Sequence, residues 1–120
     1  MSLSDEIQEA IGAHGLWKGR LHTAVETGNS KFTAASVAED SQCAFGRFLY
    51  SNTDPAIRNS AHWRTCLDLH SRFHQSAAHV LQLALNGNKE AAQKAMDPQS
   101  DFFKLSRSLT AEMLKWQASK

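Results

Sequence analysis

The sequence has little of what marks several large classes of protein. Its 120 residues contain two cysteines, too few for a framework of disulfides. No run approaches the roughly 18 apolar residues of a membrane-spanning helix, and residues 1–8 lack the features of a signal peptide. Thirteen basic residues balance 12 acidic ones without the basic stripe that nucleic-acid binding demands. We therefore expect a cytoplasmic protein with no membrane insertion and no nucleic-acid partner.

Strand patterns are missing as well, whereas apolar residues recur at helical spacing along the chain. No short internal repeat or low-complexity tract interrupts this pattern. The elements predicted, in chain order, are a helix at 4–26, a loop or broken turn at 29–40, a helix at 40–50, a long helix at 54–87 that Asn59 and Ser60 could interrupt, a short helix at 89–96, and a last helix that starts afresh after Asp97-Pro98 and ends near 117.

These elements define the expected fold. Three long helices and a shorter one predict an all-α protein, an antiparallel four-helix bundle with an additional short helix. The length suits one hydrophobic core, so residues 1–120 are expected to form a single domain. The tryptophans Trp17, Trp63 and Trp116 fall at core spacing and are interpreted as packing residues.

Three of the six histidines stand where the helical pattern should place an apolar residue. His70 and His74 share the stripe of Leu67 and Leu81 in the long helix, and His14 lies on the apolar side of the first helix. These three imidazoles therefore point toward one core. The remaining histidines, His22, His62 and His79, lie off the stripes and are expected at the surface.

A metal ion would satisfy three buried imidazoles at once. An unpaired buried polar group costs about 1–3 kcal/mol, and three in one bundle are hard to satisfy by hydrogen bonds alone. Side chains at i and i+4 of a helix are about 5–6 Å apart at Cβ, which lets two ring nitrogens reach one ion at about 2.0–2.1 Å. We therefore predict a Zn²⁺ site containing His14, His70 and His74, with a cysteine as the natural fourth ligand.

The spacing leaves two choices for that cysteine. Cys66 and His74 are eight residues apart, roughly 12 Å along an intact helix, so they cannot share one ion. Either Cys66 pairs with His70, or His70 pairs with His74 and the thiolate comes from Cys43. Cys43 stands in the first turn of its predicted helix, where the helix dipole favours a thiolate.

These motifs resemble the chemoreceptor zinc-binding (CZB) domain family. The family has a histidine before a tryptophan, a C-x-F/L-G-x-W-L-Y box and an H-x-x-x-H pair. This sequence has HGLW from His14 to Trp17, CAFGRFLY from Cys43 to Tyr50, and HSRFH from His70 to His74, in the same order. Phe48 stands at the usual tryptophan position of the box.

The resemblance implies a zinc site of three histidines and one cysteine made by His14, Cys43, His70 and His74. Cys66 is then a core residue, with a role as resolving thiol for Cys43 as the weaker alternative. Members of the family are usually fused to a chemoreceptor or a diguanylate cyclase and signal as dimers. The resemblance therefore implies a homodimeric regulatory protein that acts on such a partner in trans and responds to zinc or to oxidants such as hypochlorous acid at Cys43.

Two other functions compete with regulation. A structural or zinc-buffering site would use the same ligands, and a zinc hydrolase would leave one coordination position for water. The hydrolase is the weaker of these, because the chain has no H-E-x-x-H motif and no carboxylate between His70 and His74. We therefore expect no enzymatic activity.

Overall fold

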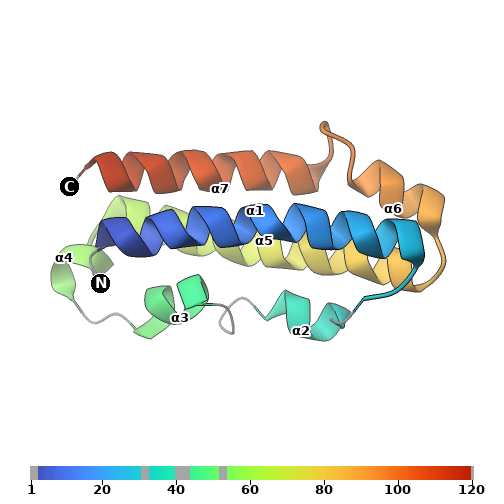
Figure 1. Cartoon of the computed structure of the whole chain (residues 1–120). Coiled ribbons are helices and arrows are strands. Elements are labelled where there is room, and N and C mark those ends of the chain that lie inside the picture. The colour runs from blue at the N-terminus through green and yellow to red at the C-terminus, as the bar shows by residue number, and fades with distance from the viewer. Residues whose placement is uncertain (1–2, 31–32, 40–43, 52–53, 120) are drawn as a thin grey trace.

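The computed structural model describes residues 3–30, 33–39, 44–51 and 54–119. Most of these residues are helical and none is in a strand, which confirms the predicted all-α class. Figure 1 shows three long helices lying side by side, with short helices along them and at the ends. The helices are α1 (Leu3–Thr27), α2 (Ala34–Ala38), α3 (Ala44–Ser51), α4 (Pro55–Arg58), α5 (Ala61–Leu85), α6 (Lys89–Ala95) and α7 (Asp101–Ala118).

The expected four-helix bundle is not confirmed in that detail. Only α1, α5 and α7 are long, and the short helices α2 and α3 lie along α5, in the lower part of Figure 1. The stretch 29–40, predicted as a loop or broken turn, contains α2 because Thr33 and Ser36 form a reciprocal capping box. The buried side chain of Val37 then anchors α2 to the core.

The predicted interruption at Asn59 and Ser60 is confirmed. Asp54 caps α4 by accepting a hydrogen bond from the Ala56 amide at 3.0 Å, and Pro55 occupies the first helical position. Asn59 ends this short helix, and the Ser60 hydroxyl then caps α5. The two-residue break turns the chain into α5, which packs against every other described helix.

The core lies between α5, α1 and α7. Its largest fully buried side chains are those of Trp116, Phe73 and Phe102, and Phe73 stacks on Phe102 with ring centroids 5.4 Å apart. Alanines on α5, including Ala77 and Ala84, are fully buried and let the long helices approach closely. Because α5 contributes to every part of this core, any group on its inner face is held away from water.

The tryptophans divide between the core and its edge. Trp116 is fully buried, as predicted, whereas Trp17 and Trp63 are partly buried against the core. Trp63 donates its indole N–H to the Leu49 carbonyl at 3.0 Å, which ties α5 to α3. Trp63 therefore holds α3, the helix that follows Cys43 in the chain.

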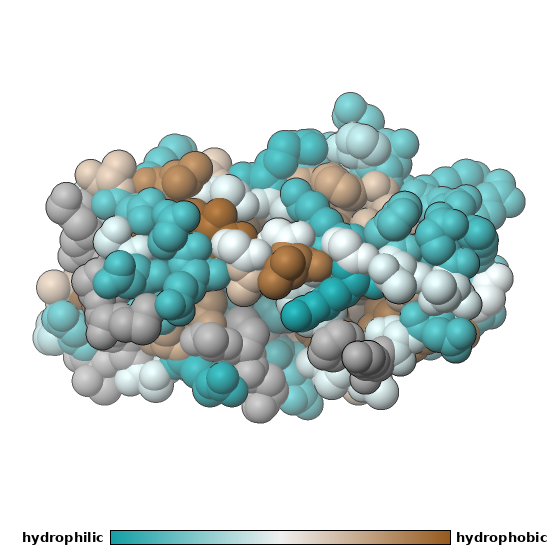
Figure 2. Space-filling model, in the orientation of Figure 1, coloured by the Kyte–Doolittle hydropathy of each residue, from teal (hydrophilic) through white to brown (hydrophobic). Residues whose placement is uncertain are grey.

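The outer surface is mixed in character. Figure 2 shows a face that is largely hydrophilic, with apolar side chains in small separate patches. Among the described helices, none combines the length and the apolar character needed to cross a membrane.

Candidate metal centre

Three histidine side chains meet inside the fold between α1 and α5. The Nε2 atoms of His14 and His70 are 3.1 Å apart, and those of His70 and His74 are also 3.1 Å apart. Only 6 %, 0 % and 3 % of the three residues is exposed, in chain order. Their ligand atoms lie within 4.8 Å of one another, and they are the only three-residue or larger group of potential metal ligands in the described part of the chain. We call them the histidine cluster.

Backbone carbonyls orient two of the three rings. The Nδ1 atom of His14 is 2.8 Å from the Ala10 oxygen, and that of His74 is 2.8 Å from the Val37 oxygen. A carbonyl oxygen only accepts, so each Nδ1 carries a proton, and the neutral form of such a ring has a bare Nε2. This is the tautomer that metal-binding histidines adopt when their second nitrogen donates to the protein.

Burial keeps the imidazoles uncharged. Burial, with a smaller effect from nearby His74 and an opposing one from the hydrogen bond to Ala10, lowers the pKa of His14 from 6.5 to about 4. Burial, followed by the proximity of His14 and His74, lowers the pKa of His70 to about 2. Both rings are therefore neutral at physiological pH, which is the form that binds a metal.

The two contacts between Nε2 atoms cannot both be hydrogen bonds while the three rings are neutral. The Nε2 atoms of His14 and His74 only accept, and the ring of His70 carries at most one proton on its own Nε2. At least one of the two 3.1 Å contacts therefore brings two lone pairs together. A cation among the three nitrogens would turn this repulsion into attraction.

The nitrogen spacing also suits zinc. Two ligands at about 2.0–2.1 Å from a tetrahedral ion are about 3.3 Å from each other. The two 3.1 Å separations in the histidine cluster are close to that value, and all three ligand atoms lie within 4.8 Å of one another. The residues present therefore fit a zinc ion, with one tetrahedral position left for a further ligand.

Aromatic rings pack around the cluster and cover most of it. Phe73 packs edge-on against His14 and His74, with centroids 5.2 and 5.7 Å apart. Phe45, on α3, lies 5.9 Å from the His14 ring and 5.3 Å from the His70 ring. The cluster thus sits in an apolar shell to which α3 contributes.

Of the two cysteines, the structure describes Cys66. Cys43, predicted as a metal ligand and as the redox-sensitive residue, lies outside the described residues. Cys66 is fully buried and is not part of the histidine cluster. Burial, and to a smaller extent Glu112, raises the pKa of the Cys66 thiol to about 12, so this group stays protonated. Its surroundings agree with the prediction of a core residue.

The other histidines lie away from the cluster. His22 and His79 are exposed, as predicted, whereas His62 is only partly exposed. The Nδ1 atom of His62 is 2.5 Å from a carboxylate oxygen of Glu112, which links α5 to α7. This contact across the bundle was not predicted.

Sequence reasoning also missed the support that α2 gives to His74. The Val37 carbonyl comes from a short helix in a stretch predicted as a loop, and it fixes the ring 37 positions further along the chain. The capping pair Thr33 and Ser36, followed by the apolar Val37, was the available signal for this helix. No sequence pattern specifies which side chain such a carbonyl will meet.

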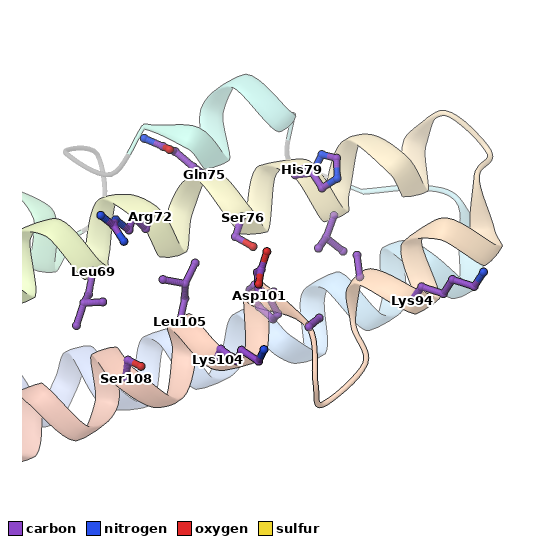
Figure 3. A pocket seen from close by; sticks show the side chains of 14 residues that line it. Leu69, Arg72, Gln75, Ser76, His79, Lys94, Asp101, Lys104, Leu105 and Ser108 are labelled. Carbon is purple, nitrogen blue, oxygen red and sulfur yellow. The ribbon is translucent and has the colours of Figure 1, made fainter.

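A groove lies on α5 away from the histidine cluster. It has a volume of about 920 Å³ and runs between α5 and α7, with Leu69 and Leu105 facing each other across it (Figure 3). None of the clustered histidines lines it. Its charged lining residues are of both signs, Arg72, Lys94, Lys104 and Asp101, and Arg72 pairs with Asp68 at 3.2 Å. The groove is therefore separate from the metal centre, although α5 forms a wall of both.

The metal-free protein should lose folding free energy as the pH falls below about 6.5. At His14 and His70 the folded state has the lower pKa, so the unfolded chain takes up protons first and acid favours unfolding. Each histidine contributes a slope of up to about 1.4 kcal/mol per pH unit. Urea unfolding with a chelator present, between pH 5 and 7, measures this slope above the range where carboxyl groups titrate.

Two glutamine variants on α5 supply the control for this measurement. His70→Gln removes one buried titrating group and should reduce the slope by up to about 1.4 kcal/mol per pH unit. His79→Gln changes an exposed residue of the same helix and should leave the slope as it was. Equal slopes in the wild-type protein and the His70→Gln variant would contradict the prediction.

Comparison with known families agrees with the geometry of the cluster. The profile of the family described as the chemoreceptor zinc-binding domain matches residues 14–81. The match begins at His14 and takes in His70 and His74, as well as Cys43. Comparison with curated proteins and with solved structures gave no significant match. Because the matched stretch covers more than half of the 120 residues, the chain belongs to the chemoreceptor zinc-binding domain family, a family of zinc-binding signalling domains.

Proposed function

We propose that this protein is a zinc-responsive regulatory domain without enzymatic activity. The observation that carries the proposal is the convergence of three buried imidazole side chains from α1 and α5. The ligands are His14, His70 and His74, with Cys43 as the fourth. Four protein ligands would leave no coordination position for a catalytic water, which is why regulation is favoured over hydrolysis.

The ligands connect parts of the fold that could otherwise move separately. A bound zinc ion would supply a positive charge that holds these donors together. His14 belongs to α1, and His70 and His74 belong to α5. Through its hydrogen bond to Val37, His74 also engages α2. Loss of the metal would thus loosen several helices together, and a change in their packing is what a partner would detect.

Chain connectivity supports Cys43 as the fourth ligand. Phe45 lies against the rings of His14 and His70, with centroids 5.9 and 5.3 Å away. Cys43 is two residues from Phe45, and two residues span at most about 7 Å. The α3 helix is held in place by the hydrogen bond from Trp63 to Leu49. Cys66, by contrast, remains a protonated thiol in the core.

Replacing Cys43 should weaken zinc binding far more than replacing Cys66. Cys43→Ala removes a ligand, and because loss of a supporting partner alone costs about 10- to 100-fold in affinity, we expect a loss greater than 100-fold. Cys66→Ala is the matched control and should keep nearly the wild-type affinity. Elemental analysis and competition with a chromophoric chelator measure both. Equal losses in the two variants would rule out the assignment.

Oxidation of Cys43 is a second input that we propose for the same site. A thiolate attacks the oxygen of hypochlorous acid, forms a sulfenic acid and releases chloride with the bonding electron pair. The sulfur is oxidised and the chlorine is reduced, so no other reactant is needed. A sulfenic acid is a poorer ligand than a thiolate, and oxidation would therefore free the metal.

Addition of hypochlorous acid should release zinc from the loaded protein. We expect peptide mass spectrometry to find one added oxygen at Cys43 and none at Cys66, whose thiol is buried and protonated. The Cys66→Ala variant should release zinc as the wild type does, and a thiol reductant should restore binding. Zinc release with Cys43 unmodified would contradict the proposed redox input.

We further propose that the protein acts as a homodimer on a chemoreceptor or a diguanylate cyclase in trans. The support is the family, whose members are zinc-binding signalling domains. Sedimentation should show a dimer of the protein alone, and with a receptor or cyclase fragment a larger species whose amount depends on zinc. A strict monomer with and without zinc would argue against the dimer, and a complex indifferent to zinc would argue against the regulatory role.

A further inference from the structure

A small opening reaches the histidine cluster from the surface between α1 and α3. It has a volume of about 130 Å³ and is lined by His14, Phe45 and Trp17, with Glu6 and Glu9 among the other lining residues. One water needs about 10–15 Å³ of such space, so the opening has room for several waters. Figure 1 shows α3 lying beside the N-terminal half of α1, and these two helices supply the residues that line the opening.

His14 is the member of the cluster nearest to solvent. It is 6 % exposed and forms part of the wall of the opening, whereas His70 and His74 are 0 % and 3 % exposed and do not line it. A cation that enters here would therefore meet His14 before the other two ligands. The large groove between α5 and α7 offers no such contact, because none of the clustered histidines lines it.

The mouth of the opening carries negative charge. Glu6 and Glu9 precede His14 by eight and five residues on α1, about 12 and 8 Å along the helix axis. In the described part of the chain neither carboxylate forms an ion pair with a lysine, arginine or histidine. The guanidinium of Arg20 stacks 4.8 Å from the centroid of Trp17, another lining residue, and offsets part of this charge.

We propose that this opening is the route by which zinc exchanges with the histidine cluster, and that Glu6 and Glu9 accelerate its approach. The proposal rests on zinc binding by the cluster, as proposed above. Charges of one sign that line a cleft raise the local concentration of a counter-ion and its association rate, by factors of about 10 to 1,000 for extended clefts. For two carboxylates partly offset by Arg20 we expect the lower end of that range.

Charge removal tests the role of the carboxylates. The double variant Glu6→Gln/Glu9→Gln should bind zinc about 3- to 10-fold more slowly at 10 mM salt. The difference should shrink at 0.5 M salt, because the screening length then falls below the roughly 8–12 Å between these residues and His14 along the helix axis. Stopped-flow mixing of metal-free protein with zinc and an indicator measures the rate. The control Glu26→Gln/Glu90→Gln removes the same charge from residues that do not line the opening and should bind at nearly the wild-type rate.

Obstruction of the opening tests the route itself. Ala13 lines the opening and is an exposed residue of α1, so Ala13→Trp narrows the passage at a surface position. Association and dissociation should slow by a similar factor, with the equilibrium affinity nearly unchanged, a pattern that damage to the ligands would not produce. Ala111→Trp, at an exposed position on α7, is the control and should change neither rate.

The outcomes separate this proposal from the one on which it depends. If the wild-type protein takes up no zinc, zinc binding itself is wrong. If it takes up zinc but both opening variants behave as their controls do, the histidine cluster stands and the route is overturned. Slower exchange in both opening variants, with affinity preserved in Ala13→Trp, supports the route.

Discussion

The burial of three imidazoles in one apolar core is the constraint on which the rest of this structure depends. A ring buried beside two others is costly to charge, and its N–H and its remaining lone pair both need partners. The carbonyls of Ala10 and Val37 accept two of these protons, so α1 and α2 are tied to the same centre. Phe73 and Phe45 pack edge-on against the rings and supply apolar surroundings. What results is a preorganised set of donors that a divalent cation completes.

The buried histidine rings can bind a metal without first losing a proton. Because burial lowers the pKa values of His14 and His70 to about 4 and about 2, a metal displaces no proton from either ring at neutral pH. The thiol of Cys66 is buried in the core and kept protonated, so it does not compete with the histidines for a metal. A regulatory input at the histidine cluster would therefore act through the metal.

Most of the helices were predictable because their ends are chemically marked. Asp54 with Pro55 begins α4, Ser60 begins α5, and Gly28 and Gly87 adopt positive φ angles of 73° and 81° just after α1 and α5. The prediction of a loop at 29–40 was wrong because tertiary contacts outweigh the local sequence pattern there. A five-residue helix such as α2 is too short to be stable alone, and it forms because Val37 is buried. For the same reason the regular four-helix bundle was not confirmed: α2 and α3 are separate short helices.

The sequence by itself determined that His14, His70 and His74 lie on inward-facing helical stripes, because a 3.6-residue period assigns each side chain to a face wherever the helix goes. It also determined the break at Asn59 and Ser60, because caps act locally. Only the tertiary structure decided that α1 and α5 meet in the register that brings three Nε2 atoms together, and that Val37 supports His74. Helix register and the opening beside Glu6 and Glu9 depend on side-chain packing between segments far apart in the chain, and no local pattern encodes that packing.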